Sequence, residues 1–193
     1  MKRIVAITGG IGAGKSVVCH ALGAMGFPVY DCDSQARAIM DNDCDIKARI
    51  AAEITPQALG GDNSLNRKAI AACVFSDPEK LKRLNAIVHA AVRDHFASWT
   101  RAQKSPLVFV ETAILYESGF DRLVNEIWEV TAPTEIRIGR VMRRSGLSRD
   151  EIERRIASQA PTVNPAHRII VNDGLTPMIS QLLQLLDDNN DPA

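Results

Sequence analysis

The residues best suited to chemistry stand near the start of the sequence, where 9–16 spell Gly-Gly-Ile-Gly-Ala-Gly-Lys-Ser. This is a complete G-x-x-x-x-G-K-S loop, in which glycines let backbone N–H groups come close to phosphate oxygens. In this motif Lys15 reaches the β- and γ-phosphates of a nucleotide, and the hydroxyl of Ser16 binds Mg²⁺. The spacing therefore predicts a nucleoside triphosphate site.

The segments on either side of this loop have the character that the motif requires. Residues 4–7 form a short apolar run that is typical of a buried strand. Val18, Leu22 and Met25 recur at helical spacing after the loop, and such a helix turns its positive end toward the phosphates. A glycine-rich turn that merely joins strand to helix is the plainer alternative, and the full motif in this context argues against it.

Two aspartates follow the second predicted strand, which is residues 28–30. In open α/β sheets the ligand lies outside the carboxyl ends of the strands, so Asp31 and Asp33 could each meet a substrate or a metal ion. Ser34 can cap the helix that continues through Met40. In the alternative, one of the two aspartates serves only as a helix cap. Capping preferences support this alternative as well as they support a functional role.

The whole chain, residues 1–193, is expected to form a single unit or one core with inserted pieces. Its 23 basic and 23 acidic residues leave no net charge that would favour nucleic acid or membrane surfaces. No apolar run reaches transmembrane length, and no signal-peptide pattern is present. The four cysteines lack C-x-x-C spacing, which indicates reduced thiols in a cytoplasmic protein.

Residues 45–103 contain no convincing strand and three predicted helices, at 46–54, at 66–75 and from Pro78 onward. Three helices in succession exceed a simple crossover between strands. We therefore interpret 45–103 as a helical insertion that closes over a second ligand. Periodicity alone agrees equally well with an alternative in which these helices only cover the sheet and bind no ligand.

An excess of arginine marks residues 135–158. Seven arginines stand against four acids between Glu135 and Arg155. A turn at 145–147 and a capping box formed by Ser148 and Glu151 divide the segment into two helices. Charge runs are usually solvated surfaces, but this excess in one mobile hairpin of a neutral protein favours a lid that clamps phosphates with guanidinium groups.

The remaining pattern predicts strands at 107–110, 127–131 and 168–172, and a last helix after Thr176 and Pro177. The buried face expected for that helix consists of Ile179, Leu182, Leu183 and Leu186. Five strands that alternate with helices predict an α/β fold, with a parallel sheet covered on both faces. A triphosphate site, Mg²⁺, a nearby carboxylate, a helical insertion and an arginine-rich lid together indicate a small-molecule kinase.

Several separated stretches resemble the dephospho-CoA kinase family, and together they cover nearly the whole chain. They are residues 8–12 with 14–16, 30–33, 84–89 (Leu-Asn-Ala-Ile-Val-His), 111–119, 154–159 and 170–174. The resemblance implies a three-layer P-loop kinase fold and transfer of the ATP γ-phosphate to the ribose 3′-hydroxyl of dephospho-CoA. The products would be coenzyme A and ADP, as the last step of coenzyme A biosynthesis, with Mg²⁺ as cofactor.

The resemblance also implies roles for individual residues. Asp33 would accept the proton of the attacking hydroxyl or orient it, while Lys15 and Arg140 would stabilise the transferring charge. Thr8 and His89 would join Asp33 on the acceptor side. The implied ATP-binding residues are Gly10, Gly12, Ala13, Gly14, Lys15, Ser16, Val17 and Asn172, with Ser16 also on Mg²⁺.

The chain departs from the family pattern at a few positions. Val17 stands where a threonine is usual, Ala90 replaces the usual proline after His89, and Glu111 begins a Glu-Thr-Ala stretch in place of a D-V-P-like segment. This departure leaves open whether the carboxylate of Glu111 contributes to the metal site.

Two other functions compete with this one. A kinase for nucleoside monophosphates or a sugar acid is disfavoured by the D-x-D and N-A-I-V-H stretches. A nucleotide-dependent switch acting through a protein partner is disfavoured by the lack of an N-K-x-D stretch. ATP and dephospho-CoA remain the expected partners of a monomer or small homo-oligomer.

Overall fold

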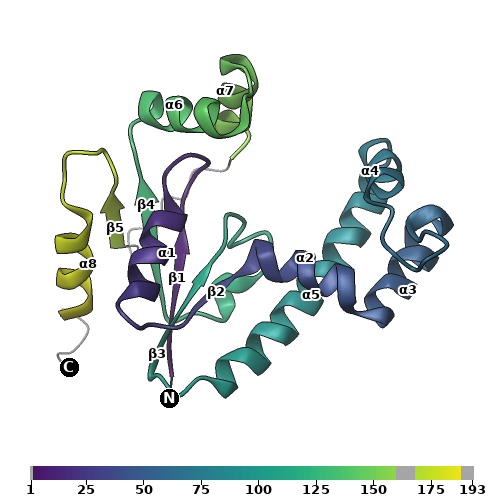
Figure 1. Ribbon diagram of the computed structural model, residues 1–193, viewed down its shortest axis with the longest axis horizontal. Helices are drawn as coiled ribbons and strands as arrows, with labels where there is room; N and C mark the ends of the chain where they lie inside the picture. The colour runs from purple at the N-terminus through teal and green to yellow at the C-terminus, as the bar shows by residue number, and fades with distance from the viewer. Residues whose placement is uncertain (1, 160–167, 188–193) are drawn as a thin grey trace. The chain divides into compact units, whose positions relative to one another are not determined.

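The structure, a computed structural model, describes residues 2–159 and 168–187 (Figure 1). The described residues form two compact units. The first, which we call the sheet unit, comprises residues 2–29, 105–115, 121–159 and 168–187. The second, the helical unit, comprises residues 30–104 and 116–120.

Five strands make one sheet in the order β2-β3-β1-β4-β5. They are β1 (Arg3–Thr8), β2 (Val29–Asp31), β3 (Leu107–Glu111), β4 (Glu126–Thr131) and β5 (Arg168–Val171). The pairs β1–β3, β1–β4 and β4–β5 are parallel. The α/β class and the five predicted strands are therefore confirmed, each strand to within one or two residues.

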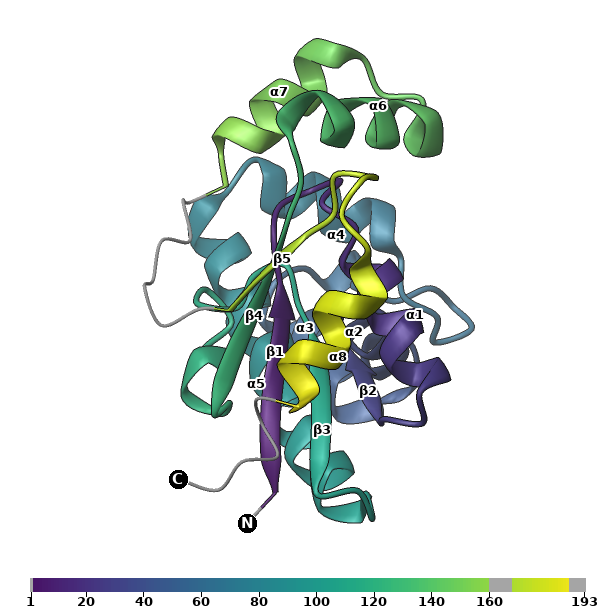
Figure 2. The same cartoon turned by 90° about the vertical axis from the view of Figure 1, so that its left-hand side faces the viewer.

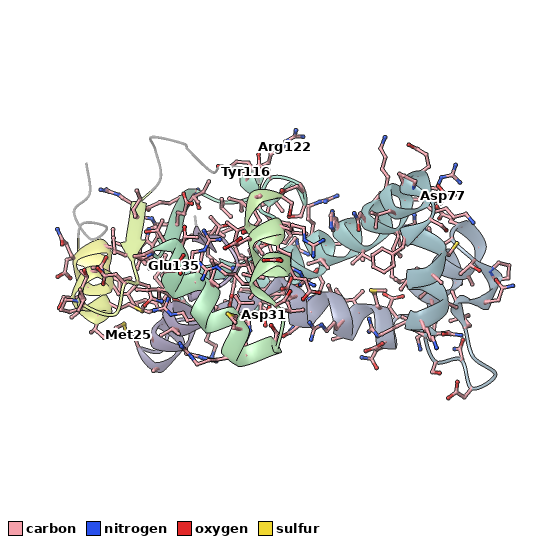
Figure 3. All side chains as sticks on the ribbon, turned by 90° about the horizontal axis from the view of Figure 1, so that it is seen from above. Met25, Asp31, Asp77, Tyr116, Arg122 and Glu135 are labelled. Carbon is pink, nitrogen blue, oxygen red and sulfur yellow. The ribbon has the colours of Figure 1, made fainter. Side chains whose placement is uncertain are left out.

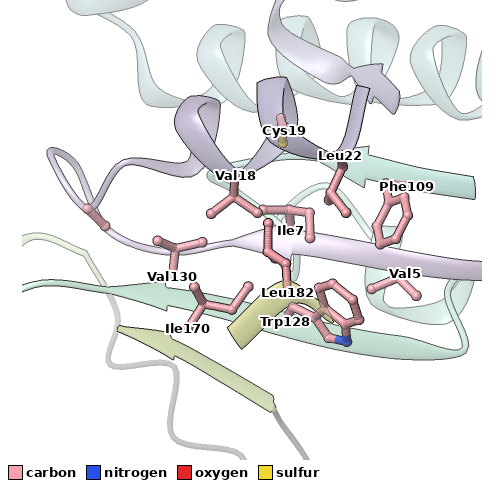
Figure 4. Close-up of a cluster of buried hydrophobic side chains, with 11 residues drawn as sticks. Val5, Ile7, Val18, Cys19, Leu22, Phe109, Trp128, Val130, Ile170 and Leu182 are labelled. Atoms are coloured by element: carbon pink, nitrogen blue, oxygen red, sulfur yellow. The ribbon is translucent and has the colours of Figure 1, made fainter. Parts of the chain in front are cut away.

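One face of the sheet is covered by α1 (Lys15–Ala24) and α8 (Met178–Asp187). The core between the sheet and these two helices joins buried side chains of four strands and both helices (Figure 4). It includes Val5, Ile7, Val18, Leu22, Phe109, Trp128, Val130, Ile170 and Leu182. On α8 the predicted buried face is only half right. Leu182 and Leu186 pack on the core, but Ile179 and Leu183 are each 50% exposed.

A helical hairpin follows β4 and consists of α6 (Thr134–Ser145) and α7 (Arg149–Ala157). Both views place it beyond the carboxyl ends of β1 and β4 (Figures 1 and 2). Gly146 ends α6 with a φ of 67°, in the left-handed region that glycine tolerates. The capping box of Ser148 and Glu151 begins α7 as predicted. The hairpin has a small core of its own, formed by Ile138, Val141 and Ile152.

The helical unit is built from α2 (Cys32–Asn42), α3 (Cys44–Glu53), α4 (Arg67–Phe75) and α5 (Pro78–Ala102). Two short 3₁₀ turns lie at Pro56–Ala58 and Phe120–Arg122. Asp77, labelled in Figure 3, accepts from the N–H groups of Glu79 and Lys80 and so caps α5. The three predicted helices of 45–103 are confirmed as α3, α4 and α5, and the function of this segment stays a prediction.

The core of the helical unit joins α3 and the 3₁₀ turn after it with α4 and α5. Its buried residues are Ile46, Ile50, Ile54, Ala58, Ile70, Val74 and Ile87. None of the helices within residues 2–159 and 168–187 is long and apolar enough to cross a membrane.

Candidate active site

The predicted phosphate loop connects β1 to α1. Gly14 caps α1 with a φ of 99°, and a Cβ on it would lie 2.0 Å from Nδ2 of Asn172. Gly12 has a φ of 76°, and a Cβ there would lie 2.6 Å from the backbone oxygen of Arg137. Both positions need glycine, because a side chain would be strained in φ and would collide with the neighbouring segments.

The end of α1 that faces the loop is suited to an anion. The first turn of α1 contains no acidic residue, so nothing there opposes the positive end of the helix dipole. Lys15 lies across the loop and donates from Nζ to the backbone oxygen of Gly9 at 2.9 Å. Ser16 is exposed on the first turn of α1. The loop thus presents an ammonium group and a hydroxyl beside a helix N-terminus.

Arg140 and Asn172, both predicted from the sequence, meet at this loop from distant segments. Arg140, on α6, donates from Nη1 to the backbone oxygens of Gly12 and Ala13 at 3.4 and 3.3 Å. Its Nη2 donates to Oδ1 of Asn172 at 3.1 Å. Asn172 follows β5 and donates from Nδ2 to Ala13 O at 2.8 Å. The structure thereby brings a guanidinium group to the rim of the predicted phosphate site.

Arg137 and Gln159 hold the loop as well, a role that neither residue was predicted to have, although Gln159 ends the 154–159 stretch that resembles the family. Nε of Arg137 donates to the backbone oxygen of Ile11 at 2.8 Å. Oε1 of Gln159 accepts from the N–H of Ile11 at 2.9 Å and from Nη2 of Arg137 at 3.3 Å. Burial lowers the pKa of the Arg137 guanidinium below its usual value. No local pattern distinguishes Arg137 from the other arginines of its segment.

The two aspartates after β2 have different surroundings. Asp31 is the N-cap of α2, since its Oδ1 accepts from the N–H groups of Asp33 at 3.0 Å and Ser34 at 3.2 Å. The prediction that Ser34 caps this helix is wrong, because Ser34 already lies inside α2, where its N–H is one of the groups that need a cap. Asp33 stands exposed on the first turn and makes no capping bond.

A pocket of about 480 Å³ runs along α5 in the helical unit. Its lining is a single face of the helix plus one loop residue, namely Pro78, Leu81, Lys82, Asn85, Ala86, His89, Arg93 and Glu117. Arg93 also donates from Nη1 to the backbone oxygen of Ser118 at 2.7 Å. Burial lowers the pKa of His89 below its usual 6.5, and the charge of Arg93 lowers it further while Glu117 opposes the shift. His89 is therefore neutral near pH 7.

The predicted acceptor residues are divided between the units. Thr8 is buried at the end of β1 in the sheet unit, with 3% of its surface exposed. Asp33 and His89 belong to the helical unit, on α2 and α5. Glu111, whose role was left open, ends β3 opposite Ile7 of β1. Val17 is 54% exposed on the first turn of α1.

A protein-family model described as dephospho-CoA kinase matches residues 3–177. The chain belongs to the dephospho-CoA kinase family. A dephospho-CoA kinase of Bacteroides fragilis (strain YCH46) is 36% identical over 186 residues, which are 94% of this chain and 90% of the relative. One from Thermus thermophilus is 42% identical over 158 residues, 82% of this chain and 75% of the relative.

Solved structures have the same fold. The crystal structure of a Thermus thermophilus protein has a TM-score of 0.85 and 36% identity over 99% of each chain. A dephospho-CoA kinase from Campylobacter jejuni has a TM-score of 0.70 at 23% identity, over 99% of this chain and all of the other. A shikimate kinase from Acinetobacter baumannii, at 0.52 and 14% identity, shares the fold alone. The chain is accordingly an ATP-dependent kinase, and its role in coenzyme A biosynthesis follows from its membership of the dephospho-CoA kinase family.

Proposed function

We propose that this chain transfers the γ-phosphate of ATP to the ribose 3′-hydroxyl of dephospho-CoA, with Lys15, Asp33 and Arg140 as its catalytic residues. The observation that carries the proposal is the meeting of Arg140 and Asn172 at the backbone of Gly12 and Ala13. Phosphoryl transfer depends mainly on positioning and on neutralising negative charge. A loop that holds the ammonium group of Lys15 and the guanidinium group of Arg140 fits that requirement.

On the ATP side, the loop and the N-terminus of α1 bind the phosphates. Lys15 exchanges its bond to Gly9 O for the β- and γ-phosphates, and Arg140 neutralises charge that builds on the transferring group. Asn172 lies on the adenine side of the same site. The ATP-binding set comprises Gly10, Gly12, Ala13, Gly14, Lys15, Ser16, Val17 and Asn172.

Mg²⁺ is the proposed cofactor, and the residues present fit it. The exposed hydroxyl of Ser16 is a hard oxygen ligand at the start of α1, and the phosphates of the nucleotide supply further oxygen ligands. This mode of binding needs no cluster of acidic side chains. When bound, the ion neutralises charge on the β- and γ-phosphates.

On the acceptor side, Asp33 provides the carboxylate that accepts the hydroxyl proton or orients the hydroxyl for attack. Its exposed position on the first turn of α2, with capping performed by Asp31, supports a role other than helix stabilisation. Thr8 and His89 complete the proposed acceptor set. A neutral imidazole at His89 can both donate and accept a hydrogen bond with the acceptor.

The pocket along α5 supports the same assignment. From Pro78 to Arg93 the helix rises by about 22 Å, at 1.5 Å for each residue, which suits a long and narrow acceptor such as dephospho-CoA. The positive charges of Lys82 and Arg93 can pair with the diphosphate of the acceptor, and Leu81 can pack against the less polar part of the acceptor. We accordingly propose 45–103 as the acceptor-binding insertion and 135–158 as the lid of a single kinase unit.

We further propose a cytoplasmic protein that works as a monomer or small homo-oligomer, with ATP and dephospho-CoA as partners and neither nucleic acid nor membrane among them. Its four cysteines form no disulfide with one another, which supports a reducing compartment.

The deciding experiment measures ADP release from ATP with dephospho-CoA, with a panel of nucleoside monophosphates and with shikimate as acceptors. We expect kcat/KM for dephospho-CoA to exceed the others by at least about 100-fold, since a site built to hydrogen-bond its acceptor rejects analogues that leave those groups unpaired. Phosphorus NMR of the product should identify a 3′-phosphate. A higher kcat/KM with any nucleoside monophosphate would overturn the proposed acceptor.

A further inference from the structure

Ile11, at the tip of the phosphate loop, is held on three sides by the segment that contains the α6–α7 hairpin. Its backbone oxygen accepts from Nε of Arg137 at 2.8 Å, and its N–H donates to Oε1 of Gln159 at 2.9 Å. Its side chain packs against the hairpin core of Ile138, Val141 and Ile152. Both polar groups and the apolar side chain of one loop residue are thus engaged by residues at least 126 positions away.

The contacts around Ile11 form a closed ring, because Nη2 of Arg137 also donates to Oε1 of Gln159 at 3.3 Å. The guanidinium group lies directly against Gly10, where a Cβ would stand 2.2 Å from Nη2 of Arg137 and 3.0 Å from Oε1 of Gln159. The fit is too close to admit even a methyl group at Gly10 without displacing these side chains.

We propose that Ile11, Arg137 and Gln159 form a joint that couples the α6–α7 hairpin to the phosphate loop and sets the geometry of the loop for ATP. Glycines give the loop many conformations, and ordering them on binding costs conformational entropy. A joint that fixes Ile11 in advance removes part of that cost and aligns the N–H groups that follow. Arg137 and Gln159 are positioning residues in this proposal and act through Ile11.

A direct role of Arg137 on phosphate predicts different behaviour. A guanidinium that binds phosphate acts by its charge, so loss of Gln159, which has no charge, should then leave ATP binding unchanged. If Arg137 acts through Ile11, both side chains hold the backbone of the same residue, and each should lose its effect when the other is absent.

The first experiment compares two substitutions of Gln159. Gln159→Met keeps the length of the side chain but removes the acceptor, so the partly buried N–H of Ile11 loses its bond, and we expect KM for ATP to rise about tenfold. Gln159→Glu keeps an acceptor whose charge is paired by Arg137, so KM for ATP should stay within about threefold of wild type. KM for the acceptor should change in neither variant.

Hydrogen exchange of the Ile11 amide gives a readout that does not depend on catalysis. We expect exchange to accelerate in the Gln159→Met variant and to remain slow in the Gln159→Glu variant. Unchanged Ile11 exchange together with unchanged KM for ATP in the Gln159→Met variant would overturn the joint.

The second experiment is a double-mutant cycle of Arg137→Met and Gln159→Met, with Arg144→Met as the control. Arg144 is an exposed arginine on the same helix, so its substitution removes the same charge without touching Ile11. The double variant should bind ATP no more weakly than the worse single variant, and Arg144→Met should bind normally. Additive losses would show that Arg137 and Gln159 act independently, and an equal loss in Arg144→Met would show that charge alone is at work; either result would refute the proposal.

Discussion

Asn172 donates a hydrogen bond from Nδ2 to the backbone oxygen of Ala13 at a distance of 2.8 Å, across 159 positions of sequence. The bond ties the end of β5 to the phosphate loop, and the other end of the same amide accepts from Arg140 at 3.1 Å. An amide is suited to this place because it donates on one side and accepts on the other.

Asn172→Asp should weaken ATP binding by about tenfold or more. The carboxylate cannot donate to Ala13 O, so it repels that oxygen, and it pairs with Arg140 where the phosphates need that charge. Titration calorimetry with ATP checks the affinity, and thermal unfolding checks that the fold persists. An unchanged dissociation constant would exclude Asn172 from the nucleotide site.

Lys15→Ala should abolish most turnover while the protein remains folded. The ammonium group neutralises charge on the β- and γ-phosphates, and its hydrogen bond to the carbonyl of Gly9 lies within the loop. Steady-state rates measure the loss, which we expect to exceed about 100-fold, and circular dichroism measures the fold. Near-normal turnover would remove Lys15 from the catalytic residues.

Arg140→Lys should lower kcat by about 10- to 100-fold, although the charge is kept. A lysine cannot reproduce the planar fork that reaches Gly12 O, Ala13 O and Asn172 together. The loss should fall on kcat, because the interaction strengthens in the transition state. A change confined to KM would indicate uniform binding instead.

Asp33→Asn should lower kcat by about 10²- to 10⁴-fold with little change in ATP affinity, since an amide cannot accept the proton of the attacking hydroxyl. Its stability should match wild type, because Asp31 caps α2. The matched variant Asp31→Ala should instead lower the free energy of unfolding by about 1 kcal/mol. A wild-type kcat in Asp33→Asn would show that Asp33 is not a catalytic residue.

His89 should make the protein less stable as pH falls below about 6.5. Burial lowers the pKa of His89 in the folded state, so in that range the unfolded chain binds a proton that the folded chain resists. Its contribution is fully present above pH 6.5 and is lost as pH falls through the folded-state pKa. Unfolding temperatures at about pH 7.5 and about pH 5.5 test this, and His89→Gln should lose less between the two than wild type does.

The local parts of the site could be predicted from the sequence because their causes are local. The loop needs glycine at positions set by its own backbone, and Lys15 and Ser16 follow at fixed spacing. The capping box at Ser148 was equally clear. Ser34 was mistaken for the cap of α2 because Asp31 stands only three residues earlier and both residue types are good caps.

What the sequence could not predict depends on tertiary structure. The roles of Arg137 and Gln159 come from contacts with Ile11 across 126 and 148 positions. Gln159 ends the 154–159 stretch that resembles the family, but the stretch alone does not reveal which residue it contacts. Similarly, the apolar stripe of α8 is wider than the surface it packs on. Leu182 and Leu186 pack on the core while Ile179 and Leu183 stay half exposed, so contacts with the sheet decide which apolar residues of α8 are buried, and periodicity alone does not.

The close approach of Arg137 to Gly10 couples the side chains that are tolerated at two positions far apart in the chain. A Cβ at Gly10 would lie 2.2 Å from Nη2 of Arg137, in the space that the guanidinium group occupies. A Cβ at position 10 would therefore displace the guanidinium end of Arg137, the same group whose Nε donates to the backbone oxygen of Ile11. Position 10 thus has two neighbours to accommodate, the proposed phosphates of the nucleotide and the side chain of Arg137 on α6.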